Sequence, residues 1–178
     1  MSQFKSLSRR QMMSLLSVAA SLPIVSRPVV LSSAKSDVKD RLSGVMIFAM
    51  TPMLMRNGKA EVDLEGVATN MKSFAAQRDP FSVAVCGGSG EFYELTEEER
   101  RRALAAAARE KGNRLLLGGV GGDTTKATVA SAQAAEEAGA DVLLLMPSEV
   151  IARKGEAVLL NLYLEVAKSV SIGVIGFS

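Results

Sequence analysis

Residues 84–100, AVCGGSGEFYELTEEER, pass from an apolar run to a helix start within a few positions. The apolar run stops at Cys86, and two glycines, a serine and a third glycine follow it. Thr96 has Glu99 three residues later, which is the spacing of a capping box and predicts a helix over 97–111. The stretch therefore predicts a strand, a bare glycine turn that carries one hydroxyl group, and a helix, in that order.

The same strand–helix unit repeats along the chain. Apolar runs without polar alternation are typical of parallel strands that are covered on both faces. Five such runs occur, at 45–50, 81–86, 114–119, 141–146 and 173–177. Helical periodicity separates them, at 63–77, 97–111, 124–137 and 155–169. The run starts at 45 and 173 are four repeats apart, so one repeat averages 32 residues.

Two α/β folds agree with this order of elements. A five-stranded doubly wound sheet would be complete at this length, whereas a (β/α)8 barrel needs ~250 residues and would stop here after its fifth strand. A doubly wound sheet usually has its glycine-rich turn after the first strand, where this chain reads TPMLMRNG. Here the glycine turns follow the second and third strands, as CGGSGE and GGVGGDTT. We therefore predict a truncated (β/α)8 TIM barrel over 35–178, made of the first four βα units and strand five, with the helices on one face.

Residues 1–34 differ in composition from the rest of the chain. Arg9 and Arg10 precede a moderately apolar run at 12–25, and small residues follow it. This layout is typical of a cleavable secretory signal, and the arginine pair resembles a twin-arginine export signal. We predict a twin-arginine-type signal segment at 1–34 and an exported or periplasmic protein. The alternatives are a disordered or organelle-targeting leader and a cytoplasmic protein.

The composition excludes several kinds of site. The chain has no histidine and a single cysteine, Cys86, which excludes histidine-based acid–base catalysis, an internal disulfide and a thiolate zinc cluster. The formal net charge is +2, and residues 1–34 contribute four basic residues and no acid to it. The triplet Arg100–Arg102 follows three glutamates, and we interpret it as a solvated helix face. We predict no metal, no cofactor, no nucleic-acid partner and, once the leader is removed, no membrane partner.

The glycine turn after the second strand has the chemistry of a carboxylate site. Glycines let the backbone approach a ligand and can point successive N–H groups into one concavity. Ser89 adds a hydroxyl donor, and Thr51 at the end of the first strand could add a second one. In this interpretation Gly118–Gly122 keep the floor of the site open for a substrate. The glycines could equally well close tight turns only, and the residues alone do not separate the two.

Five motifs occur in order over 42–175: GVMIFAMTPM, NGKAEVD, CGGSGEFYELTEEE, GGVGG and AEEAGADVLLLMP. Together they resemble the dihydrodipicolinate synthase / N-acetylneuraminate lyase family. The glycine at position 88, with GEF after Ser89, is most similar to the 5-dehydro-4-deoxyglucarate dehydratase branch. The resemblance implies a class I aldolase-like barrel. It also implies a lyase that binds a 2-oxo sugar acid as a Schiff base on a strand lysine and then eliminates water and carbon dioxide.

The resemblance also assigns roles to residues. Ser89, with the backbone of Gly88 and Gly90, would hold the substrate carboxylate. Thr51 would lie on the rim of the same substrate-binding site, and Glu91 would brace the loop. The implied partner is a small-molecule 2-oxo acid. Full-length relatives are commonly tetramers, so the resemblance is compatible with a homo-oligomer.

The chain departs from the family pattern at the reaction centre. The family has its Schiff-base lysine on the sixth strand, and none of the nine lysines here lies in an apolar run. Phe177 stands at the place of the family's proton-relaying tyrosine, and MPSEV replaces its aromatic PPY motif. We therefore expect no catalytic residue in this chain and no activity of the chain alone. A partial lyase, a non-catalytic carboxylate binder and a remnant that does not fold are the three alternatives.

Overall fold

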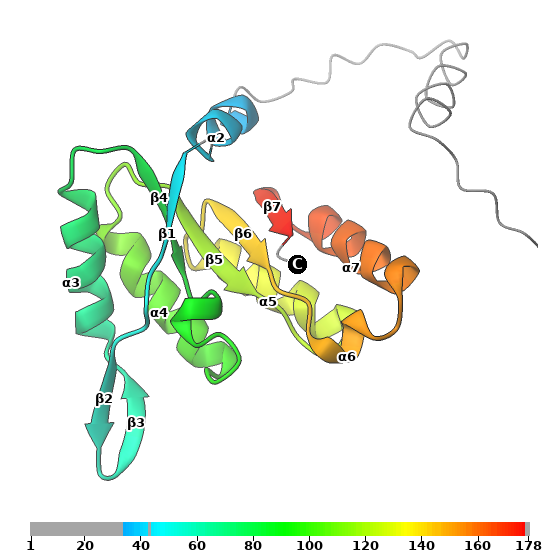
Figure 1. Ribbon diagram of the computed structural model, residues 1–178, viewed down its shortest axis with the longest axis horizontal. Coiled ribbons are helices and arrows are strands. Elements are labelled where there is room, and N and C mark those ends of the chain that lie inside the picture. Colours follow the sequence, from blue (N-terminus) through cyan, green and yellow to red (C-terminus); the bar gives the residue numbers. More distant parts are fainter. Residues whose placement is uncertain (1–33, 43, 177–178) are drawn as a thin grey trace, which may run out of the picture. The chain divides into compact units, whose positions relative to one another are not determined.

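The computed structural model of the protein describes residues 34–42 and 44–176 (Figure 1). Five parallel strands form one sheet in the order β1-β4-β5-β6-β7. The strands are Val45–Phe48, Phe81–Val85, Leu116–Val120, Val142–Leu145 and Gly173–Gly176. Each strand pairs with the next strand of this sheet along the chain. This order confirms the barrel prediction and contradicts the doubly wound alternative, in which the strand order reverses.

Four helices of 12 to 14 residues connect the parallel strands. They are α3 (Leu64–Ala75), α4 (Glu97–Glu110), α5 (Thr125–Glu137) and α7 (Glu156–Ser169). Asp63, Thr96 and Thr124 cap the first three of them by accepting a hydrogen bond from a backbone N–H group three residues later. The capping box predicted for Thr96 and Glu99 is present in full. Local sequence signals therefore place these helices where the periodicity predicts them.

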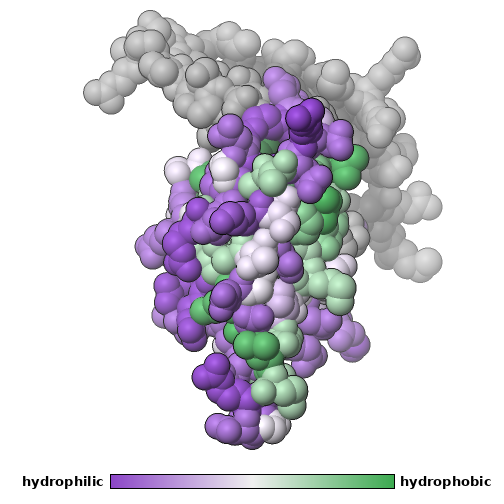
Figure 2. All heavy atoms as spheres, turned by 90° about the vertical axis from the view of Figure 1, so that its left-hand side faces the viewer, coloured by the Kyte–Doolittle hydropathy of each residue, from purple (hydrophilic) through white to green (hydrophobic). Residues whose placement is uncertain are grey.

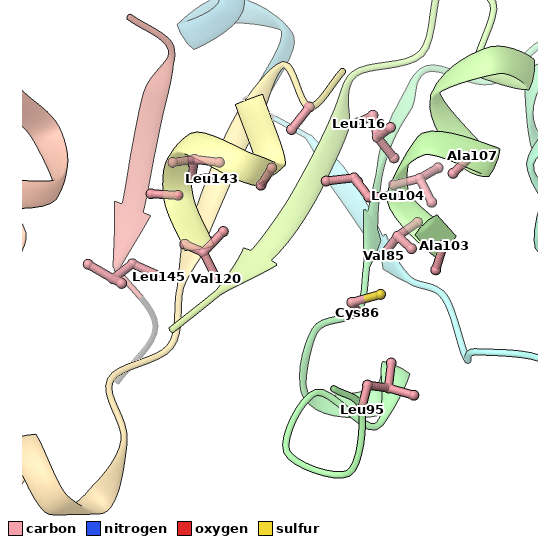
Figure 3. Packing of buried hydrophobic residues seen from close by; sticks show 14 of the residues in the cluster. Val85, Cys86, Leu95, Ala103, Leu104, Ala107, Leu116, Val120, Leu143 and Leu145 are labelled. Atoms are coloured by element: carbon pink, nitrogen blue, oxygen red, sulfur yellow. The ribbon is translucent and has the colours of Figure 1, made fainter. Parts of the chain in front are cut away.

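The core has two parts, which lie on opposite faces of the sheet. Val85 and Leu116 belong to a cluster that includes residues of α3, α4, α5 and α7, and Figure 3 shows them gathered with Leu104 and Ala107 of α4. The alternate strand residues form a second cluster, which is joined by Val38 of α2 (Ala34–Leu42). The strand residues of this second cluster are Ala84, Leu117, Val142 and Leu144. The four long helices thus cover one face, as in a barrel whose other face points inward.

The structure contains a hairpin that the sequence analysis missed. Strands β2 (Met53–Arg56) and β3 (Lys59–Val62) pair antiparallel after β1. Asn57 and Gly58 turn the chain with φ angles of 52° and 75°, which is the positive pair that a two-residue hairpin turn needs. Toward the lower end of Figure 2, where the hairpin lies, hydrophobic residues stand beside hydrophilic ones, and Met55 is 73% exposed. Two further helices, α2 and the short α6 (Glu149–Ala152), were also not predicted.

Some predictions concern residues outside the described ranges. The signal segment predicted at 1–34 falls outside them except for Ala34, where α2 begins. Phe177, at the place of the family's tyrosine, also falls outside. The signal segment and the exported location therefore stay predictions. In the part of the chain that the structure describes, every helix is too short or too polar to cross a membrane.

Candidate functional site

The glycine turn lies at the carboxyl end of β4, the second of the five strands of the parallel sheet. A short 3-10 helix, Gly88–Gly90, follows β4 directly, and Thr51 follows the neighbouring strand β1. Because parallel strands end at the same edge of a sheet, the two segments meet there. This is the edge at which TIM-barrel enzymes carry their active sites.

The turn closes on itself through one carbonyl group. The oxygen of Gly87 accepts hydrogen bonds from the N–H groups of Gly90 and Phe92, at 3.0 and 3.2 Å. Cys86 and Glu91, which flank the turn, have φ angles of 54° and 58°. A non-glycine residue rarely adopts this left-handed conformation, which costs of order 1–3 kcal/mol and is found most often at functional sites. The turn is therefore a compact unit held in a costly conformation.

Thr51 contacts the turn directly. Its hydroxyl group donates a hydrogen bond of 2.7 Å to the carbonyl oxygen of Gly90, and its side chain is 8% exposed. A Cβ atom on Gly90 would lie 3.1 Å from the oxygen of Ala49 and 3.3 Å from the Thr51 hydroxyl oxygen. The structure thus brings together two predicted site residues. The hydroxyl hydrogen of Thr51 and the N–H group of Gly90 both bond within the protein.

Gly88 and Ser89 are the exposed residues of the turn. A Cβ atom on Gly88 would meet only the methyl group of Met146, at 3.9 Å, so the space beside this residue is open. A Cβ atom on Gly87, by contrast, would lie 3.3 Å from the ring of Phe48. Of the four predicted binding residues, Ser89 and Gly88 are therefore the two that solvent reaches.

The prediction that Gly118–Gly122 keep an open floor for a substrate is wrong. A Cβ atom on Gly119 would lie 1.9 Å from the carbonyl oxygen of Cys86, and one on Gly121 would lie 2.4 Å from that of Met146. These glycines allow the end of β5 to approach the backbone just after β4 and just after β6. Their role is close packing below the turn, which a single sequence does not distinguish from an open site.

Arg100 is partly buried, so it does not lie on the solvated helix face that the sequence predicts. Its guanidinium group donates hydrogen bonds to the carbonyl oxygens of Phe92, at 3.0 Å, and Leu95, and its Cζ atom lies 4.5 Å from the centre of the Phe92 ring. Arg101 does remain exposed and pairs with Glu98. The first two residues of the basic triplet therefore differ: Arg101 is exposed, whereas Arg100 binds the loop that follows the glycine turn.

Cys86 is not a thiolate nucleophile. Burial raises the pKa of its thiol from 9.0 to about 11, although the nearby positive charge of Arg100 and a hydrogen bond with the Thr51 side chain oppose the rise. In Figure 3 the residue lies at the end of β4, with Leu95 on the loop beyond it. A thiol that stays protonated at neutral pH acts as a small apolar side chain.

Other chemistry has little support in the described residues. No group of three or more His, Cys, Asp or Glu residues within 34–42 and 44–176 could hold a metal ion. The five parallel strands as described contain no lysine, as expected from the sequence. A cavity of about 480 Å³ does exist, but it lies among α2, α7 and the starts of β6 and β7, and Val38, Asp141 and Gly173 belong to its lining. It is thus at the other end of the sheet from the turn.

Comparisons with known proteins agree with the geometry. The sequence model of the dihydrodipicolinate synthetase family matches residues 41–148. A dihydrodipicolinate synthase from Agrobacterium tumefaciens has a similar structure, with a TM-score of 0.63 and 31% identity over 77% of this chain and 45% of its own. Another, from Oceanobacillus iheyensis, has a TM-score of 0.68 at 21% identity, over 79% of this chain and 45% of its own, and shows the fold alone.

A third structure is that of a prophage protein of the dihydrodipicolinic acid synthase family from E. coli K12 in complex with pyruvate. It has a TM-score of 0.60 and 26% identity, over 75% of this chain and 43% of its own. The present chain therefore spans less than half the length of these solved structures. A comparison with curated protein sequences found no match.

Proposed function

This chain belongs to the dihydrodipicolinate synthetase family, and we propose that it forms the carboxylate-binding part of a lyase that acts on a 2-oxo acid through a Schiff base. The turn after β4 carries the proposal, because its exposed residues Gly88 and Ser89 lie at the carboxyl edge of a parallel sheet. The related E. coli protein in complex with pyruvate supports a 2-oxo acid as the ligand.

Within this proposal some residues of the site contact the ligand, and others hold the turn in its conformation. Ser89 offers a hydroxyl donor, and with the exposed backbone beside it this residue suits a carboxylate, which is only an acceptor. Thr51 supports the turn from the loop after β1 through its hydrogen bond to the carbonyl oxygen of Gly90. Glu91 supports it through its carbonyl oxygen, which accepts from the N–H groups of Glu94 and Leu95 at 3.0 and 3.2 Å.

The Schiff base itself needs an amine that the described strands do not contain. A lysine suited to imine formation is desolvated and held on a rigid element, and none lies in the five parallel strands. The resemblance assigns that lysine to a sixth strand. We therefore propose that the described residues supply the carboxylate contact of the lyase and not the amine that forms the Schiff base. A non-catalytic carboxylate binder is the alternative function, and the same observation favours it.

The open space beside Gly88 supports a ligand larger than pyruvate. A side chain at this position would extend into space that meets only the Met146 methyl group, at 3.9 Å. The polyhydroxy chain of a 2-oxo sugar acid could occupy that space, in agreement with the resemblance to the dehydratase branch. A Gly88→Thr variant should then bind pyruvate like the wild type and bind 5-dehydro-4-deoxyglucarate at least about tenfold more weakly, a loss of ~1.4 kcal/mol. Equal binding of both ligands by the variant would contradict this substrate assignment.

The experiment that tests the function is a binding titration combined with chemical trapping. Saturation-transfer NMR with pyruvate should show saturable binding, weakened at least about tenfold by Ser89→Ala, since a lost hydrogen bond to a charged group costs about 1.5–3 kcal/mol. Ser73→Ala on α3 is the matched control, because Ser73 is also exposed and its hydroxyl group donates within its own helix, to the carbonyl oxygen of Thr69. Borohydride treatment should leave the mass unchanged. A stoichiometric adduct on a residue such as Lys154 would show that the chain has its own nucleophile.

We also propose export of the protein, on the basis of the arginine pair in the leader. Arg9 and Arg10 precede a weakly apolar run, as in twin-arginine signals. A tagged chain should be found outside the cytoplasm with a new N-terminus near Lys35, and the double variant Arg9→Lys, Arg10→Lys should remain inside. Uncleaved cytoplasmic protein in a host with a working twin-arginine pathway would contradict the proposal.

A further inference from the structure

Arg100 bridges the helix α4 and the loop that precedes it. Through one nitrogen, Nη1, it donates hydrogen bonds to two carbonyl oxygens of the loop, those of Phe92 and Leu95. Its guanidinium group also faces the ring of Phe92, with 4.5 Å between Cζ and the ring centre. Two hydrogen bonds and a cation–π contact therefore fix one segment of backbone and one ring.

Phe92 connects Arg100 to the glycine turn. Its N–H group donates to the oxygen of Gly87, which is also the acceptor for Gly90. Its buried ring packs against Gly121, since a Cβ atom there would lie 3.0 Å from the ring. The residue that Arg100 holds is thus the residue that closes the turn around Ser89.

The orientation of Arg100 is costly and is not required by the helix. Burial lowers the pKa of its guanidinium group, and the charges of Glu97 and Glu99 offset this only in part. Its Nε atom is buried without a hydrogen-bond partner among the described residues. Arg101, on the same helical turn, lies in solvent. An unpartnered buried donor weakens stability, so a role in fixing one local conformation explains the arrangement better than a contribution to stability.

We propose that Arg100 is a positioning residue for the carboxylate site: by holding Phe92 and Leu95 it fixes the turn that presents Ser89. Ligand contact is assigned to Gly88 and Ser89, and Arg100 acts through them from behind. The inference rests on the proposed function for its consequence in binding, whereas its consequence for the turn itself can be measured without any ligand.

The ligand-free test is residue-resolved hydrogen exchange on the full chain. In Arg100→Met the amides of Gly90 and Phe92 should exchange at least about tenfold faster, whereas the amide of Val83, bonded to Leu115 in the core, should be unchanged. Arg100→Lys, which keeps the charge, should lie in between. Arg101→Met is the matched control and should match the wild type. An equal acceleration of turn and core amides, or none at the turn, would overturn the proposal.

The second test measures pyruvate binding by the same variants. Arg100→Met should bind about tenfold more weakly than the wild type, Arg100→Lys should recover part of the loss, and Arg101→Met should bind normally. If the wild type binds and Arg100→Met binds equally well, the positioning role is wrong. If the wild type does not bind, the proposed function fails, and hydrogen exchange alone decides whether Arg100 positions the turn. Should Arg100→Met not fold, the same comparisons between Arg100→Lys and the wild type decide.

Discussion

The central and edge strands of this sheet have the same apolar character but differ in burial. Every residue of β5 and β6 is buried, and in β4 only Phe81 is partly exposed. In β1 and β7 the two end residues are exposed and the two middle ones are half-buried, and Val45 reaches 65% exposure. A barrel strand needs a neighbour on both sides. The burial of the side chains of a strand therefore depends more on how many strands flank it than on its own sequence.

The largest expected effect is the loss of stability when a central-strand glycine is replaced, with an edge-strand glycine as the control. Gly119→Val in β5 places a side chain against the Cys86 carbonyl, where even a Cβ atom would be at 1.9 Å. We expect a loss of more than about 3 kcal/mol or no folding. Gly173→Val in β7 is the control, because its Cβ would lie 3.8 Å from the nearest atom and the change should cost less than about 1 kcal/mol. Urea unfolding measures both, and equal losses would break the comparison.

A second pair of variants removes methyl groups from a central and an edge strand. Leu143 in β6 is fully buried, so Leu143→Ala should cost about 2–5 kcal/mol in the free energy of unfolding. Val45 in β1 is mostly exposed, so Val45→Ala should change it by less than about 0.5 kcal/mol. Thermal unfolding of both variants at one protein concentration checks this. A Val45→Ala loss above about 1 kcal/mol would mean that the β1 edge is covered in solution.

The buried thiol at the end of β4 predicts a loss of stability at high pH. Burial raises the pKa of Cys86 from 9.0 to about 11, so the folded state keeps a proton that the unfolded state releases. The contribution of the protonated thiol to the free energy of unfolding is fully present below pH 9. It is lost as the pH rises to about 11, and the loss amounts to roughly 2–3 kcal/mol. The stability difference between wild type and Cys86→Ala, measured from pH 8 to 11, isolates it from other groups. A difference that does not change with pH would contradict the raised pKa.

The smallest expected effect concerns association of the open edges. Unpaired edge strands with exposed apolar side chains favour contact between copies, and a charge on the edge opposes it. Val45→Lys should reduce concentration-dependent self-association severalfold in sedimentation experiments and leave the monomer fold unchanged. Lys59→Arg in the hairpin is a charge-neutral control. If Val45→Lys associates as strongly as the wild type, the β1 edge is not the surface through which copies meet.

Local signals in the sequence predicted most of the fold. Thr96 and Glu99 form a capping box within one helical turn, so their role needs no distant partner. The hairpin turn at Asn57 and Gly58 is also a local signal, but the segment before it lacks the polar alternation that would predict a strand. The choice between a barrel and a doubly wound sheet is not a local signal, because it depends on the positions of the glycine turns after several strands.

The site was predicted less completely, because its contacts join distant parts of the chain. The position of Ser89 in a glycine turn predicts its place in the site, whereas the three glutamates before Arg100 predict a surface residue. Its actual acceptors are carbonyl groups of a loop whose path the sequence does not show. The close approach of Gly119 to Cys86 likewise depends on two strands pairing and was not visible in either strand alone.

The most direct test of the central claim, that the turn after β4 binds a carboxylate, is an amide-resolved NMR titration of the full chain with pyruvate. The account predicts saturable shift changes at the amides of Gly88 and Ser89, and their loss in Ser89→Ala. The amides of β1 and β7, at the open edges, should not respond. Saturable changes centred instead on the cavity near Val38 and Asp141, or no saturable change at the turn, would contradict the claim.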